Sequence, residues 1–162
     1  KVRIGCMIEV PSAAVISDLL AQECDFLAIG TNDLIQYLLA VDRSNQEVGE
    51  FYNPMHPSLI RLIKLIVTQA SQYGTPVCVC GEIAGDPRFT PLLIGLGVHE
   101  LSVSIRNLPL IKKVVRQTSV VRSHQLAELV LSHSTSSEIQ EFLNAEFPSV
   151  MPDDHHYVSL YC

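Results

Sequence analysis

The sequence predicts an α/β fold built on a parallel sheet, because strand-like and helix-like segments alternate through the first two thirds of its 162 residues. The strand-like segments are short, continuous apolar runs without strict alternation, which is typical of parallel strands covered on both faces. The helix-like segments carry apolar residues at steps of three and four. Four consecutive strand–helix units are predicted in this way, and beyond Thr118 only helices follow.

Local signals justify the first two units. An apolar run ends at Glu9, and Pro11 and Ser12 then begin a helix. The second apolar run ends at Gly30, and a short helix precedes a polar loop over residues 42–53. The predicted strands of the chain cover residues 2–10, 25–30, 77–80 and 100–104, and the predicted helices cover residues 12–22, 34–39, 58–73, 87–96, 108–117, 123–131 and 135–145.

The later units have clearer helix boundaries. Pro57 occupies the first turn of the strongest amphipathic helix, and Gly74 follows its last turn as a cap. Thr135-x-x-Glu138 is a capping box that opens the last predicted helix. We therefore expect one folded unit over residues 1–147 and a loosely ordered tail over residues 148–162.

Composition excludes several classes of protein. The formal net charge of −6 argues against a nucleic-acid binder, which normally carries a basic patch. No apolar window is long enough to predict a membrane span. The five cysteines are odd in number and lie in apolar runs, which favours reduced thiols in the cytoplasm. Because the chain opens inside a predicted strand and has no initiator methionine, we expect it to be a piece of a longer protein.

Polar side chains follow the predicted parallel strands at their carboxyl ends, where such folds gather their functional groups. Glu9 and Asp33 could share a hard cation such as Mg²⁺. Asn32 and the backbone amides beside it offer donors to an anion, and Arg43 could add a fork for phosphate or carboxylate. Cys80 supplies an ionisable thiol at the end of the third strand.

Each of these residues also has a structural explanation. Glu9 before a proline could cap the next helix, Asn32 and Asp33 could form a turn, and Cys80 could be a small buried apolar residue. Cys78 and Cys80 are only a weak indication of a metal or redox site, since no other cysteines have the spacing of a zinc site. We also expect their side chains to lie on opposite faces of the strand. We expect the histidines to be surface or capping residues.

Several long motifs in their order resemble one family, the phosphoenolpyruvate-utilising enzymes, and within it Enzyme I of the bacterial sugar phosphotransferase system. The resemblance covers residues 2–147. The motifs are GCMIEVPSAA from Gly5, DFLAIGTNDLIQYLLAVDRSN from Asp25, HPSLIRLIK from His56, CGEIAGD from Cys80 and LSVSIRNLPLIKKVVR from Leu101.

The resemblance implies a fold and a role for each candidate residue. It implies that the four units are the second half of a TIM-type (β/α)₈ barrel that binds phosphoenolpyruvate, with two further helices at the C-terminus. Glu9 and Asp33 match Mg²⁺ ligands of the family. Asn32, Asp33 and Arg43 match groups that hold phosphoenolpyruvate. Cys80 matches the proton donor that converts the enolate to pyruvate.

The resemblance also implies partners that lie outside this sequence. The parent protein would move the phosphoryl group from phosphoenolpyruvate to one of its own histidines and on to the histidine phosphocarrier protein, which starts sugar uptake. None of the six histidines here matches the phosphohistidine motif, so we expect this chain alone to be inactive. We also expect a homodimer, because a half-barrel has two unpaired sheet edges that can pair with another copy. The alternatives are a non-catalytic dimerisation module, a relative of pyruvate phosphate dikinase or phosphoenolpyruvate synthase, and a thiol redox protein using Cys78 and Cys80.

Overall fold

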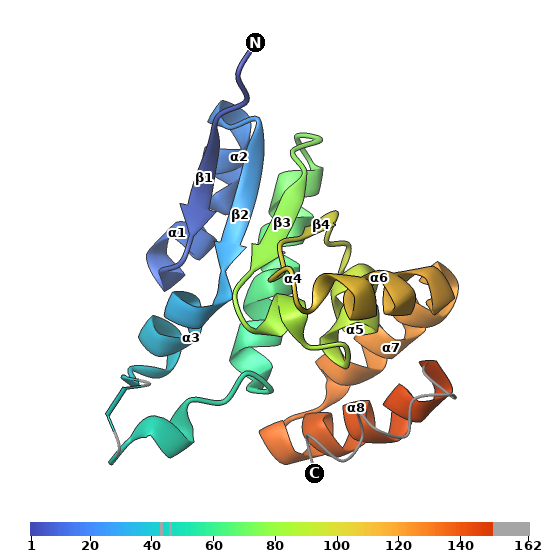
Figure 1. Cartoon of the computed structure of the whole chain (residues 1–162). Helices are drawn as coiled ribbons and strands as arrows, with labels where there is room; N and C mark the ends of the chain where they lie inside the picture. The colour runs from blue at the N-terminus through green and yellow to red at the C-terminus, as the bar shows by residue number, and fades with distance from the viewer. Residues whose placement is uncertain (43, 46, 151–162) are drawn as a thin grey trace.

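The computed structural model describes residues 1–42, 44–45 and 47–150. Its strands form one parallel sheet in the order β1-β2-β3-β4, so each strand pairs with its neighbour along the chain (Figure 1). The strands are β1 (Gly5–Ile8), β2 (Phe26–Gly30), β3 (Val77–Cys80) and β4 (Glu100–Leu101). This confirms the α/β class and the four parallel units predicted from the sequence.

Helices connect the strands and continue after the sheet. None of those in the described part of the chain is long and apolar enough to cross a membrane. The α-helices are α1 (Pro11–Val15), α2 (Ser17–Glu23), α3 (Thr31–Leu39), α4 (Pro57–Ser71), α5 (Phe89–Leu96), α6 (Leu108–Gln117), α7 (Val120–Ser132) and α8 (Ser136–Val150), and two 3₁₀ turns are η1 (Gly49–Phe51) and η2 (Ile83–Gly85).

Several predicted element boundaries are wrong. Strand β1 begins at Gly5 rather than at residue 2, β4 ends at Leu101 rather than at residue 104, and α7 begins at Val120 rather than at residue 123. The single helix predicted over residues 12–22 is two helices, because Ile16 leaves the helical region at φ −102° and ψ 23°. Helix α3 begins at Thr31, three residues earlier than predicted. Helix α8 continues to Val150, so the first three residues of the predicted tail are helical; residues 151–162 lie outside the described residues.

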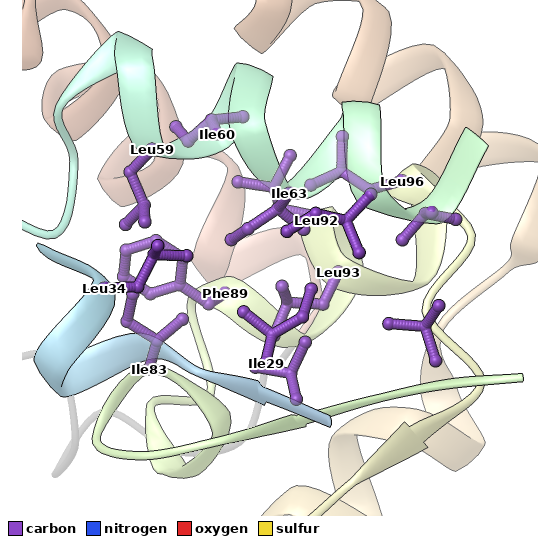
Figure 2. Packing of buried hydrophobic residues seen from close by; sticks show 14 of the residues in the cluster. Ile29, Leu34, Leu59, Ile60, Ile63, Ile83, Phe89, Leu92, Leu93 and Leu96 are labelled. Carbon is purple, nitrogen blue, oxygen red and sulfur yellow. The ribbon is translucent and has the colours of Figure 1, made fainter. Parts of the chain in front are cut away.

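The core lies on one face of the sheet. Ile29 and Val79 project from β2 and β3 onto α4 and α5, and both are fully buried. Figure 2 shows Ile29 beside Leu92 and Leu93, with Ile63 packed from above. This face holds most of the large buried side chains of the chain.

The other face of the sheet is open in this chain, although the continuous apolar runs are typical of strands covered on both faces. Met7 is 46% exposed, and Cys78 and Cys80 are half-buried on this side. In β3 the side chains alternate strictly between buried valines and half-buried cysteines. The open face matters for function because the candidate site lies at the edge formed by the carboxyl ends of its strands.

Helix α7 packs closely against α5. A Cβ at Gly95 would collide with the main chain of Ser123 and lie 2.9 Å from the Cβ of Ala127. The imidazole of His124 makes a 2.9 Å hydrogen bond with the carbonyl oxygen of Gly95. Only a residue without a side chain allows the two helix backbones to approach this closely.

Candidate functional site

The carboxyl ends of β1, β2 and β3 meet at one edge of the sheet and bring the predicted residues together. The register pairs Ile8 with Ile29 and Gly30 with Cys80. Glu9 therefore follows β1 beside Gly30, and Cys80 ends β3 on the other side of the same glycine. Glu9 and Cys80 are both half-buried on the open face.

Two hydrogen bonds tie the segment after β2 to the segment after β3. The hydroxyl of Thr31, which is fully buried, donates to the carbonyl oxygen of Cys80 at 2.8 Å. The main-chain N–H of Glu82 donates to Oδ1 of Asn32 at 3.0 Å. Together these bonds fix the main chain on both sides of Gly81. We call this arrangement of Thr31, Asn32, Cys80, Gly81 and Glu82 the loop clamp.

Gly81 makes the loop clamp possible for two physical reasons. Its φ of +99° lies in the left-handed region that residues with a Cβ rarely adopt. A Cβ at this position would also collide with Oγ1 of Thr31 and lie 2.8 Å from Oδ1 of Asn32. Any side chain at residue 81 would therefore push the two segments apart.

Asn32 accepts hydrogen bonds at both its side chain and its main chain. Its Oδ1 accepts from the N–H of Glu82, and the hydroxyl of Tyr52 donates to its carbonyl oxygen at 3.3 Å. Only the Nδ2 group of Asn32 can donate a hydrogen bond to an anion, because Oδ1 is an acceptor. Asp33 follows in the first turn of α3 and is half-buried.

Glu9 and Met7 both reach over the bare backbone of Gly30. A Cβ at Gly30 would lie 3.1 Å from Oε2 of Glu9 and 3.1 Å from Sδ of Met7. The glycine leaves room for these two atoms to converge above β2. No cluster of three His, Cys, Asp or Glu side chains with metal-binding geometry occurs within residues 1–42, 44–45 and 47–150.

The thiol of Cys80 lies in the middle of this group. Its Sγ donates to the carbonyl oxygen of Ile29 at 3.3 Å and lies 3.9 Å from Sδ of Met7. Burial raises the pKa of the Cys80 thiol above its usual value, and the negative charge of Glu9 raises it further. The thiol is therefore held in its protonated form at neutral pH.

Cys78 and Cys80 share one face of β3, so the expectation that they face opposite sides is wrong. Residues two apart in a strand point to the same side, and Val77 and Val79 occupy the buried side. Burial raises the pKa of Cys78, with smaller contributions from Cys80 and Glu100. Cys78 lies one row further from the carboxyl edge, opposite Ala28.

Arg43 lies outside the described residues, so its predicted place at the site stays a prediction. Ser102 and Ser104, which follow β4, are exposed. The sequence analysis missed Met7, Thr31 and Tyr52 as site residues. A signal for the loop clamp was present, since a glycine directly after an apolar strand often marks a left-handed turn.

A cavity of about 310 Å³ lies next to the loop clamp, between α3, η2 and the start of α5. The side-chain amide of Asn107 lies in its wall and donates to the carbonyl oxygen of Gly85 at 3.1 Å. Glu82 and Tyr52 contribute to both the cavity wall and the contacts around Asn32. The cavity adjoins the strand-end residues but does not include Glu9 or Cys80.

Comparison with known proteins identifies relatives over most of the chain. Residues 1–120 match the family described as PEP-utilising enzyme, PEP-binding domain. The chain is 48% identical over 144 residues to the phosphoenolpyruvate-protein phosphotransferase of Buchnera aphidicola subsp. Schizaphis graminum, which covers 89% of this chain and 25% of that protein. It is 45% identical over 143 residues to the protein of the same name from Haemophilus influenzae, covering 88% of this chain and 25% of that protein.

A further relative has a different name. The chain is 43% identical over 147 residues to Multiphosphoryl transfer protein 1 of Escherichia coli (strain K12), which covers 91% of this chain and 18% of that protein. The chain thus spans a quarter or less of the length of these curated relatives.

Proposed function

The chain belongs to the phosphoenolpyruvate-utilising enzymes, as a match to their phosphoenolpyruvate-binding domain, and from that premise we propose that it supplies the catalytic edge of a phosphoenolpyruvate–protein phosphotransferase. The observation that carries the proposal is the loop clamp, which ties the main chain of Cys80 to Thr31 and that of Glu82 to Asn32. Burial and the charge of Glu9 also raise the pKa of the Cys80 thiol, so that it keeps its proton. A protonated acid next to an anion site suits a reaction that leaves an enolate behind.

The substrate is held by groups on the second unit. The Nδ2 group of Asn32 and the main chain at Asp33 donate to the anionic groups of phosphoenolpyruvate, and Arg43 adds a positive charge that pairs with phosphate or carboxylate. The oxygen of Asn32 is occupied by Glu82, so the amide is oriented before the substrate arrives. Such preorganisation lowers the cost of aligning the substrate.

We infer that Glu9 and Asp33 would hold a Mg²⁺ ion, because both are half-buried carboxylates that follow neighbouring parallel strands. Mg²⁺ takes oxygen ligands, often one or two carboxylates, and keeps several of its waters. The missing side chain at Gly30 leaves Oε2 of Glu9 uncovered by β2. When bound at these residues, Mg²⁺ would supply positive charge that offsets the negative charge of the substrate.

Cys80 gives its proton to the carbon of the enolate. When the phosphoryl group leaves phosphoenolpyruvate, the enolate electrons form a new C–H bond with the thiol proton, and pyruvate results. Burial and the Glu9 carboxylate keep that proton on sulfur until it is needed. A positioned acid of this kind contributes about 10²–10⁴-fold to the rate.

The rest of the proposal concerns the whole protein. We infer that the four parallel units are half of a (β/α)₈ barrel whose other half covers the open face of the sheet. The full protein then passes the phosphoryl group through its own histidine to the histidine phosphocarrier protein in the cytoplasm. Homodimer formation is part of the same proposal.

The experiment compares Cys80→Ala with Cys78→Ala in the intact protein that carries this segment. We expect Cys80→Ala to lower pyruvate formation by about 10²–10⁴-fold and to leave phosphoenolpyruvate affinity nearly unchanged. Cys78→Ala is the matched control, because it removes a half-buried thiol from the same strand face. Equal losses of pyruvate formation in the two variants would refute the role of Cys80.

A further inference from the structure

Three side chains from two strands converge over Gly30, and their chemistry differs from that of a Mg²⁺ site. They are the thioether of Met7, the carboxylate of Glu9 and the thiol of Cys80. We propose that these three residues form a binding site for a thiophilic cation of the class of Zn²⁺ and Cd²⁺. This binding does not depend on the proposed function and can be measured on the chain itself.

The two sulfur atoms have the right separation for a shared ion. Sδ of Met7 lies 3.9 Å from Sγ of Cys80. With two metal–sulfur bonds of about 2.3 Å, this separation corresponds to a bond angle of about 115°, close to that of a tetrahedral site. The sulfurs therefore need little movement to bind one cation.

Glu9 completes the ligand set from the same direction. Its Oε2 and the sulfur of Met7 are each 3.1 Å from the position of a Cβ at Gly30. The φ of −83° at Gly30 is open to any residue, so the backbone conformation does not call for glycine here. What the glycine provides is space, which Oε2 and Cβ of Glu9 and Sδ of Met7 occupy.

The ligand types select the class of cation. Thiolate and thioether ligands favour soft or borderline cations, whereas Mg²⁺ and Ca²⁺ bind oxygen. Coordination replaces the proton of the Cys80 thiol, which passes to solvent. If the proposed function also holds, a bound thiophilic cation removes both the catalytic proton and a Mg²⁺ ligand, and so inhibits the enzyme.

The test is a Cd²⁺ titration followed by the ultraviolet charge-transfer absorbance of the cadmium–thiolate bond. The chain is used with every cysteine other than Cys78 and Cys80 replaced by serine. We expect one Cd²⁺ per chain, no absorbance change in Cys80→Ser, and at least about tenfold weaker binding in Met7→Leu. Cys78→Ser is the matched control and should bind Cd²⁺ as tightly as the parent chain.

Two outcomes would overturn the proposal. One is that Cys78→Ser loses the Cd²⁺ signal while Cys80→Ser keeps it, which would show that the thiolate ligand is Cys78 and not Cys80. The other is displacement of Cd²⁺ by a similar concentration of Mg²⁺, which would show a site made of oxygen ligands alone. Circular dichroism of each variant separates loss of binding from loss of folding.

Discussion

Replacing Thr31 by valine removes the hydroxyl that connects the segment after β2 to Cys80 and changes little else. Valine has nearly the same shape as threonine, and residue 31 is fully buried. The variant therefore deletes the 2.8 Å hydrogen bond to the carbonyl oxygen of Cys80 without leaving a hole. It tests whether the loop clamp positions the thiol.

The expected loss of stability follows from that single bond. Removing the hydrogen-bond donor of the partly buried Cys80 carbonyl group costs about 2 kcal/mol of unfolding free energy. For a chain of this length, that loss lowers the melting temperature by about 4–8 °C. Thr31→Ser keeps the hydroxyl and removes a buried methyl group, which costs about 1 kcal/mol.

The assay that separates positioning from stability is pyruvate formation in the intact protein at a temperature where both variants are folded. A displacement of about 1 Å at a reacting group can cost about 10²-fold in rate, so Thr31→Val should lose about that factor. Thr31→Ser should keep most of the activity, although it too is destabilised. Equal activity of the two variants would show that the hydroxyl of Thr31 does not position Cys80.

Two further predictions concern stability. Gly95→Ala forces a methyl group into the main chain of Ser123, which should cost about 3 kcal/mol or more of unfolding free energy. Gly74→Ala is the control: its Cβ would meet no atom within 4 Å, so it should cost only the strain of the positive φ, about 1–2 kcal/mol. Equal melting temperatures of the two variants would contradict the close contact between α5 and α7. Hydrogen bonds from the main-chain N–H groups of Ser134 and Thr135 lower the pKa of Glu138. The stability that the Glu138 carboxylate contributes is therefore present above the pKa of the unfolded state, and it is lost as the pH falls through the lower pKa of the folded state. Between about pH 7 and about pH 3, the unfolding free energy of Glu138→Gln should therefore fall less than that of the parent chain.

Sequence signals located most elements because the signals are local. Helix α6 was predicted over the residues that it occupies, and the VCVC run of β3 was predicted without error. The break at Ile16 could not be predicted, since no glycine or proline marks it. The last turn of α8 was missed because Pro148 suggested an end, whereas burial of Phe147 against Val114 provides a tertiary contact that the sequence pattern does not reveal.

The candidate site was predicted from strand ends, and that rule has a clear limit. It finds residues that follow strands, such as Glu9 and Cys80, because their position depends on topology alone. It does not find Met7, which lies inside β1 and reaches the site through its long side chain over Gly30. The error over Cys78 had a different origin, since strand periodicity places residues two apart on one face.

Two glycines shape this edge of the sheet in physically different ways. Gly81 is required by its positive φ and by the approach of Thr31 and Asn32, so it fixes how the segments that carry Asn32 and Cys80 lie relative to each other. Gly30 has an ordinary φ and provides only space, which the side chains of Glu9 and Met7 occupy. The geometry of the site thus depends on two positions without side chains, and a methyl group at either should disturb different ligands. At Gly81 it should misplace Asn32 and Cys80, whereas at Gly30 it should displace the carboxylate and the thioether that lie over β2.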